Sequence, residues 1–85
     1  MDEKREDVFD CIDAERERQI AMYGERPQLD LREWVVILAE EVGELARAVQ
    51  GYIDGDDFES ARLHLYDEAV QTAAVAVAIA ERMKP

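Results

Sequence analysis

The sequence predicts an all-α protein, a short helical bundle that is completed by oligomerisation. Apolar residues recur at steps of three and four along three segments, and glycine, proline or an Asp-rich turn separates each segment from the next. The 85 residues make a single domain, 1–85, and a chain of this size buries only about 60–65% of its unfolded surface. Because Cys11 and His64 are each the only residue of their kind, no disulfide or zinc cage makes up the shortfall, so association of copies is expected.

The first helix is expected from about Asp7 to Tyr23. Its apolar residues recur at helical spacing, and they include Val8, Cys11, Ile12, Ile20 and Tyr23. Gly24 follows as a C-cap, and Pro27 blocks continuation of the helix. Residues 25–28 are therefore assigned to a connector.

The second helix begins at a strong start signal, because Asp30 can act as N-cap and Glu33 completes a capping box. Apolar residues then follow at alternating steps of four and three: Leu31, Val35, Leu38, Val42, Leu45 and Val49. This heptad seam predicts close antiparallel packing against another helix. Gly51 is expected to end the helix, and residues 54–57 to form a short turn in which Asp56 or Asp57 caps the next helix.

The third helix is expected from roughly Phe58 to Met83, either as one continuous helix or with a break near His64–Asp67. Its second half, Ala69 to Ala80, is apolar on nearly every face. Helices of this kind are buried, and the many alanines allow neighbouring backbones to approach closely. This segment is therefore predicted to be the central helix of the bundle.

The composition restricts the partners. A formal net charge of -11, from 21 acidic and 10 basic residues, argues against binding to nucleic acid or to an anionic membrane. The longest apolar run, Ala73 to Ala80, is far shorter than the roughly 20 residues that span a bilayer. Residues 1–7 are charged and do not resemble a signal peptide. A cytoplasmic protein is expected.

Three glutamates stand out on the second helix. Glu40, Glu41 and Glu44 fall within one arc of roughly 100° that borders the apolar seam, so all three can point at one place at the edge of the core. Like charges at this spacing repel, unless a cation or a raised pKa removes the conflict. The alternative is a solvated helix face on which Arg47 pairs with one of the carboxylates.

A polar stripe on the third helix favours the metal interpretation. His64, Glu68 and Gln71 follow at steps of four and three and enter the apolar segment. Two antiparallel helices that each offer oxygen atoms at such positions hold hard divalent cations in helical bundles. Because the ligands are oxygens, Mg²⁺ or Mn²⁺ is the expected ion. His64 is interpreted as a bystander.

Three segments, taken in order, resemble the MazG-like all-α nucleotide pyrophosphohydrolases. Residues 40–44, Glu-Glu-Val-Gly-Glu, resemble the EExxE motif of that family, and their spacing to Glu68 suits the ExxD element that follows it. Residues 15–19, Glu-Arg-Glu-Arg-Gln, with Tyr23 and Gly24, resemble the opening of small bacterial and phage members. Residues 68–78 resemble the Ala/Val-rich helix of that subgroup.

The resemblance implies a house-cleaning enzyme that hydrolyses a nucleoside triphosphate between the α and β phosphates with Mg²⁺. It implies that Glu41, Glu44 and Glu68 are metal ligands, and that Glu40 is a ligand or the base that orients the attacking water. Gln71 stands where the family has Asp. A neutral amide is a poorer magnesium ligand than a carboxylate, so the site binds metal more weakly or Gln71 acts behind the ligands.

Further candidates concern the nucleotide. Trp34 and Tyr23 can stack a nucleobase, and Arg18 and Arg47 can bind phosphate oxygens through paired hydrogen bonds. The alternatives are packing in the core or a subunit interface for the aromatic residues, and surface ion pairing for the arginines. A homodimer or homotetramer is the expected assembly.

Three hypotheses on function follow. The first is the pyrophosphohydrolase. The second is a metal- or nucleotide-binding or regulatory protein with the same fold, which has lost turnover through Gln71. The third is an acidic coiled-coil module with solvated glutamates.

Overall fold

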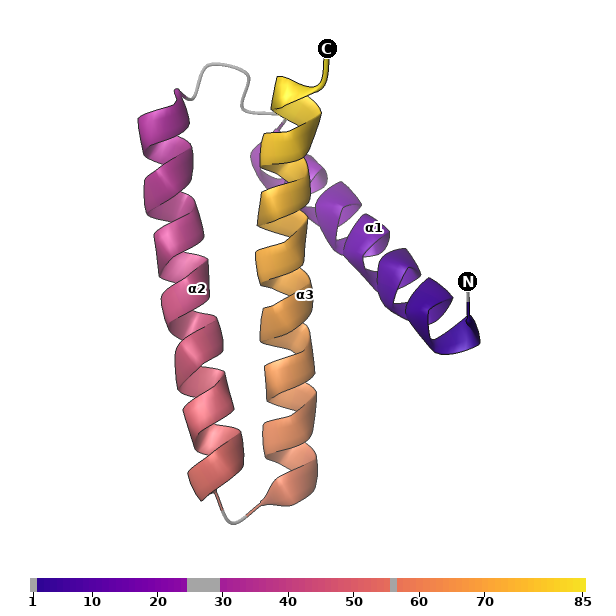
Figure 1. Ribbon diagram of the computed structural model, residues 1–85, viewed down its shortest axis with the longest axis vertical. Helices are drawn as coiled ribbons and strands as arrows, with labels where there is room; N and C mark the ends of the chain where they lie inside the picture. Colours follow the sequence, from indigo (N-terminus) through magenta and orange to yellow (C-terminus); the bar gives the residue numbers. More distant parts are fainter. Residues whose placement is uncertain (1, 25–29, 56) are drawn as a thin grey trace.

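The chain folds into three helices, as the computed structural model shows for residues 2–24, 30–55 and 57–85. They are α1 (Glu3–Tyr23), α2 (Leu31–Asp54) and α3 (Phe58–Met83), with no strand in the described ranges. The prediction of an all-α helical bundle is confirmed. Helices α2 and α3 form an antiparallel hairpin, and α1 crosses α3 obliquely (Figure 1). None of the helices in these ranges is long and apolar enough to cross a membrane.

The ends of α1 are set by its two caps. The side chain of Asp2 accepts a hydrogen bond from the Arg5 amide at 2.9 Å, so the helix begins four residues before the position expected from the apolar pattern. At the other end Gly24 has a φ of 76° and donates its amide to the carbonyl of Ile20 at 2.8 Å. The C-cap prediction is confirmed, whereas the connector at residues 25–28 lies outside the described residues.

The start of α2 is confirmed and its end is not. Asp30 accepts from the Glu33 amide at 2.9 Å, and the Glu33 side chain accepts from the Asp30 amide, which completes the capping box. Gly51 does not end the helix, because one glycine costs only about 1 kcal/mol in a helix interior. The helix continues to Asp54, and a Cβ at Gly55 would collide with the carbonyl oxygen of Gly51. The close turn therefore requires glycine at position 55.

Helix α3 is continuous, so the alternative of a break near His64–Asp67 is wrong. Asp57 caps it by accepting from the Ser60 amide at 3.2 Å. It is the central helix, since it packs against both α1 and α2, whereas the Cα atoms of α1 and α2 stay more than 8 Å apart in the described ranges. One side of the Ala69–Ala80 segment is nevertheless exposed, where burial on all sides was expected.

The contact between α2 and α3 differs from the predicted seam. The core cluster consists of Trp34, Val75 and Ala78, with Ile37, Leu38 and Ile79 packed against it. Four of the six seam residues are exposed: Leu31, Val35, Val42 and Val49. The buried side of α2 is turned by roughly 80° about the helix axis from the seam. The physical reason is Trp34, whose indole removes more apolar area from water than any valine of the seam.

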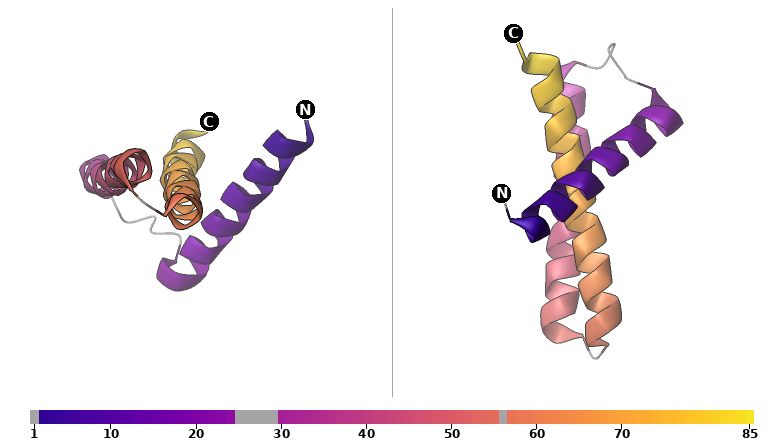
Figure 2. Two further views of the ribbon diagram at one scale, coloured as in Figure 1. Left: turned by 90° about the horizontal axis from the view of Figure 1, so that it is seen from below. Right: turned by 90° about the vertical axis from the view of Figure 1, so that its right-hand side faces the viewer.

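Helix α1 packs on one side of the hairpin (Figure 2). Its anchor is Arg16, which is 8% exposed and donates from Nε to the Glu81 carboxylate of α3 at 2.7 Å. A buried guanidinium is stable only when it is paired. This ion pair therefore fixes where α1 crosses α3, and the crossing places the C-terminal half of α1 beside the glutamates of the hairpin.

Candidate metal centre

Three carboxylates meet between the two helices of the hairpin. Glu41 and Glu44 of α2 and Glu68 of α3 each offer an oxygen, and these atoms lie within 4.8 Å of one another. Glu41 and Glu44 are on one face because they are three residues apart. Glu68 faces them because α3 runs antiparallel beside α2. The structure thus brings together the three residues that the resemblance implied as metal ligands.

The backbone around the cluster is tied by one side chain. The hydroxyl of Thr72 has one proton, which it shares between the carbonyl oxygen of Glu68 at 2.8 Å and that of Glu41 at 3.3 Å. A hydroxyl that serves carbonyls of two helices fixes their relative height. Glu41 and Glu68 are therefore held opposite each other by a contact that does not involve their own carboxylates.

The cluster carries unpaired charge. Glu68 is 9% exposed, and Oε2 of Glu68 and Oε2 of Glu41 are both buried without a hydrogen-bond partner in the part of the chain that the structure describes. Burial raises the pKa of Glu41 above its ordinary value, and the neighbouring carboxylates, Glu44 first, raise it further. Orphaned buried oxygens of this kind fit a divalent cation, which would supply the missing partner and offset the repulsion.

A cavity of about 190 Å³ adjoins the cluster and shares Glu41 with it. Helix α1 supplies one wall, which includes Glu15, Arg18, Gln19 and Tyr23. The hairpin supplies the other, which includes Trp34, Gln71 and Val75. The cavity therefore exists only because α1 crosses the hairpin at this height.

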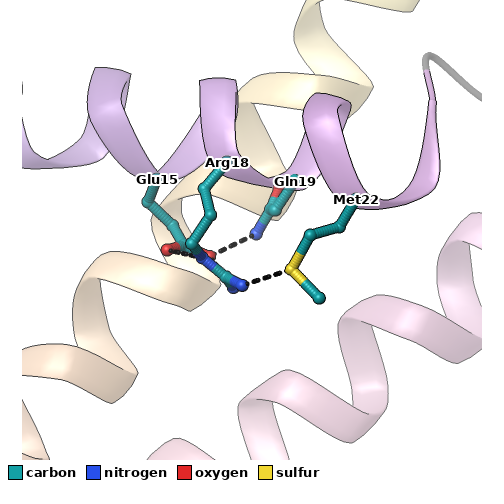
Figure 3. A network of polar contacts seen from close by, with 4 residues as sticks. All are labelled: Glu15, Arg18, Gln19 and Met22. Carbon is teal, nitrogen blue, oxygen red and sulfur yellow. Dashed lines mark hydrogen bonds and ion pairs between the residues drawn. The ribbon is translucent and has the colours of Figure 1, made fainter.

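The α1 wall is organised around one carboxylate. Glu15 accepts from Arg18 at 2.6 and 2.8 Å and from the Gln19 amide at 3.2 Å, and Arg18 also donates to the sulfur of Met22 (Figure 3). The Arg18 hydrogen bond lowers the pKa of Glu15. The same pairing, with a smaller contribution from Glu41, raises the pKa of Arg18. This wall thus presents a fixed guanidinium beside the carboxylates.

The opposite wall holds an unused donor. Trp34 is 6% exposed, and its Nε1 is buried and has no hydrogen-bond partner among the described residues. A buried N–H without an acceptor is destabilising. The indole is at once part of the core cluster, as the packing alternative held, and part of the cavity wall. A bound molecule with an acceptor atom at this point would satisfy it.

The remaining predicted residues divide into two groups. Arg18, Tyr23, Trp34 and Gln71 line the cavity. Glu40, Arg47 and His64 are exposed and lie outside both the cluster and the cavity lining. Arg47 lies back over Gly43, with Nη1 3.9 Å from where a Cβ would stand. The expected place of Arg47 at a phosphate is therefore without support from the geometry.

Glu15 is a site residue that reasoning from the sequence did not assign. Its side chain is only 12% exposed, and its charge contributes to the raised pKa of Glu41 across the gap between α1 and α2. The available signal was its spacing of three and four residues from Arg18 and Gln19, which is typical of paired side chains on one helix. The crossing of α1 over the hairpin, which puts Glu15 near Glu41, has no local sequence signal.

Comparison with known proteins finds no matching family model, no matching curated protein and no matching solved structure.

Proposed function

We propose that the chain is a nucleoside triphosphate pyrophosphohydrolase that uses Mg²⁺ or Mn²⁺ and releases the monophosphate and pyrophosphate. The observation that carries the proposal is the pair of buried, unpartnered carboxylate oxygens of Glu41 and Glu68 at the edge of a cavity. Burying two such oxygens without a partner is costly, so a divalent cation between them is the chemically consistent occupant. The resemblance of three segments to the MazG-like family supports the reaction.

In this proposal Glu41, Glu44 and Glu68 hold the cation. When bound, a divalent cation polarises phosphate oxygens and lowers the pKa of a coordinated water. Glu40 is exposed on the same helix as the cluster, where its carboxylate can accept a proton from the attacking water. Arg18, held by Glu15, offers a guanidinium to the phosphate chain from the α1 wall.

The cavity takes the non-reacting end of the substrate in this proposal. Its volume of about 190 Å³ suits one heterocyclic ring or a sugar rather than a whole nucleotide. The unpartnered Nε1 of Trp34 selects for an acceptor atom, and the ring of Tyr23 offers a surface for stacking. Assembly as a homodimer or homotetramer and a cytoplasmic location belong to the same proposal.

A second candidate function is a protein of the same fold that binds metal or nucleotide and does not turn over. Gln71 favours it, because this neutral amide lines the same cavity as Glu41 where the related family has a carboxylate. If Gln71 limits the site, Gln71→Asp should raise both metal affinity and the hydrolysis rate. If Gln71→Asp leaves the metal affinity unchanged, Gln71 is not part of the metal site.

The deciding experiment is a panel of common and modified nucleoside triphosphates with Mg²⁺ or Mn²⁺, followed by phosphorus NMR. The spectrum distinguishes pyrophosphate plus monophosphate from inorganic phosphate plus diphosphate. We expect pyrophosphate with the wild type and at least a hundredfold slower release with Glu68→Gln, since one metal ligand or transition-state contact is worth about 3 kcal/mol or more.

Glu17→Gln is the matched control, because Glu17 is an exposed glutamate of α1 outside the cluster and the cavity lining. Its activity should equal that of the wild type. Metal binding without pyrophosphate from any nucleotide would favour the second candidate. The absence of both metal binding and pyrophosphate would leave only the acidic helical module.

A further inference from the structure

Arg16 of α1 lines the same cavity as Trp34 and Gln71. Its side chain is only 9% exposed, and its one ion pair within the described residues joins Nε to the Glu81 carboxylate at 2.7 Å. An arginine that pairs through Nε alone keeps its two terminal nitrogens, Nη1 and Nη2, for a further acceptor. Neither of these nitrogens donates a hydrogen bond in the part of the chain that the structure describes. The cavity is therefore bordered by a buried guanidinium whose terminal fork is unused.

Arg18, two residues further along α1, differs from Arg16 in this respect. Its Nε and Nη2 donate to Glu15 at 2.8 and 2.6 Å, and its Nη1 donates to the sulfur of Met22 at 2.7 Å (Figure 3). Each nitrogen of Arg18 thus has a partner on its own helix, and half of the side chain is exposed to water. A buried donor without an acceptor is destabilising, whereas an exposed donor is hydrated. Of these two arginines, Arg16 is the one that a ligand would stabilise.

The facing wall of the cavity carries a second unused donor, the Nε1 of Trp34. Arg16 comes from α1 and Trp34 from α2, and the Cα atoms of these helices stay more than 8 Å apart in the described ranges. Guanidinium and indole N–H groups can only donate. The two donors therefore select for a ligand that has acceptor atoms at two separate edges.

The charge of the lining favours a neutral ligand group over a phosphate. Two arginines, Arg16 and Arg18, are matched by two glutamates, Glu15 and Glu41, and the adjoining cluster adds two more carboxylates. A phosphate gains little net attraction in such surroundings. A nucleobase, in contrast, offers acceptor atoms without a charge.

Among the nucleobases, a 6-oxopurine matches the two donors. Its O6 and N7 lie side by side on one edge and fit the paired N–H groups of an arginine, which is the commonest base-specific contact of that side chain. Its N3 is an acceptor at the opposite edge. Adenine has an amino group in place of O6 and would set a donor against a donor. Uracil has no adjacent pair of acceptors, and cytosine has its acceptors on one edge only.

We propose that the cavity binds the base of a 6-oxopurine nucleotide, with the terminal fork of Arg16 on O6 and N7 and the Nε1 of Trp34 at the N3 edge. The N1–H beside O6 finds an acceptor oxygen on Glu15 or Gln71, which line the same cavity. Arg16 is then a specificity-determining residue, and Glu81 positions it. The inference rests on the proposed function in that the base belongs to its substrate, and it adds which class of base is accepted.

The first test uses Trp34, the only tryptophan of the chain, as the reporter of binding. Its fluorescence is titrated without metal with inosine and with adenosine, which differ in the 6-oxo and 6-amino groups and in the proton on N1. We expect a Kd for inosine that is at least tenfold lower, since a bidentate contact to a base gives about tenfold to hundredfold discrimination. Equal or tighter binding of adenosine, tighter binding of cytidine or uridine than of inosine, or no change with any nucleoside overturns the proposal.

The second test separates contact with the base from anchoring of α1. Arg16→Lys keeps a positive charge opposite Glu81 and removes the fork, whereas Glu81→Gln keeps the fork and an acceptor for Nε. We expect the ratio of the two Kd values to fall to about one in Arg16→Lys. The ratio should persist in Glu81→Gln and in the control Arg62→Lys, whose exposed pair with Glu59 lies outside the cavity lining. Because an unfolded fraction affects both Kd values equally, the ratio does not depend on stability. A ratio that is lost in Glu81→Gln, or kept in Arg16→Lys, contradicts the role of Arg16.

The nucleosides carry no phosphate and the titrations contain no metal, so their outcome is separate from that of the proposed function. A preference for inosine without pyrophosphate from any nucleoside triphosphate would retain the base site and reject the enzyme. Pyrophosphate release without a preference for inosine would retain the enzyme and reject the assignment of Arg16.

Discussion

The two sides of the α2–α3 hairpin differ in chemistry although the same two helices make both. The side that meets α1 holds the glutamate cluster, the cavity and the buried Arg16–Glu81 ion pair. The exposed stripe of α2 on the other side contains only valine, isoleucine and alanine: Val35, Ala39, Val42, Ala46, Val49 and Ile53. The first side is polar, partly buried and stabilised by specific pairs. The second is apolar and open.

The difference between the two sides indicates how a short chain can carry partly buried carboxylates and still form a stable fold. An 85-residue chain has little apolar area to spare, and carboxylates at the edge of its core reduce the net gain from burial further. In the proposed homo-oligomer, a second copy would supply the missing burial on the side of the hairpin away from α1. The α1 side then remains available for charge that would be too costly in a monomer's only core.

Trp34→Ala is expected to have the largest effect, because it removes the largest side chain of the core cluster on the α1 side. Large-to-small core substitutions of this kind cost about 3–5 kcal/mol. Trp34→Phe should cost less than about 1.5 kcal/mol, since the Nε1 that it removes has no partner among the described residues. Urea denaturation at fixed protein concentration measures both. Equal losses for the two variants would mean that the indole N–H has a structural partner.

Glu81→Ala should come next, because it leaves the buried Arg16 guanidinium without its acceptor. We expect a loss of about 1.5–3 kcal/mol. The control is Glu59→Ala, whose ion pair with Arg62 is exposed on both sides and is worth less than about 1 kcal/mol. Hydrogen exchange should show faster opening of α1 in Glu81→Ala, with sedimentation unchanged. Equal losses for Glu81→Ala and Glu59→Ala would show that Arg16 does not anchor α1.

Glu41→Gln is expected to have a smaller effect of opposite sign. Without metal it removes repulsion from Glu44 and Glu68, so the protein should gain about 0.5 kcal/mol, or about 2–4 °C in melting temperature. With Mg²⁺ or Mn²⁺ the order should reverse, because only the wild type is stabilised by the cation. Calorimetry with and without metal checks both parts. A metal-dependent rise in melting temperature that is equal in Glu41→Gln and in the wild type would exclude Glu41 as a ligand.

The smallest expected effect is the pH dependence of the difference in metal-free melting temperature between Glu41→Gln and the wild type. The folded protein holds the pKa of Glu41 above its ordinary value of 4.5, so the folded state binds this proton more tightly than the unfolded state. The resulting stabilisation is fully present below pH 4.5 and is lost as the pH rises through the raised pKa. The metal-free melting temperature of Glu41→Gln relative to the wild type should therefore increase from pH 4 to pH 7. A difference that shrinks over this range would contradict the raised pKa.

Local signals in the sequence predicted the local structure well. The capping box at Asp30, the C-cap at Gly24 and the cap at Asp57 are all as expected, because each depends on side chains within four residues. The meeting of Glu41, Glu44 and Glu68 was expected from helical spacing and from the resemblance of these residues to a family motif. Gly51 was predicted to end α2, but the helix continues to Asp54. One glycine in a helix interior costs only about 1 kcal/mol, which is too little to stop a helix that its neighbours stabilise.

The rotation of α2 and the placement of α1 could not be predicted in the same way. The heptad seam was expected to pack against another helix, whereas four of its six residues are exposed, because the sequence pattern does not say which of two adjacent apolar stripes meets α3. The choice follows from the size of Trp34 and from the ion pair that Arg16 makes 65 residues along the chain. Glu15 and the cavity depend on that crossing, which is why the sequence did not assign Glu15 to the site.

The most direct test of the metal centre is a Mn²⁺ titration followed by electron paramagnetic resonance, with wild type, Glu68→Gln and Glu17→Gln at equal concentration. We predict that the wild type and Glu17→Gln bind one Mn²⁺ per chain at the cluster, and that Glu68→Gln loses at least tenfold in affinity. Binding that is weak, that has no defined stoichiometry, or that is the same in all three proteins would contradict the assignment of Glu41, Glu44 and Glu68 as a metal site.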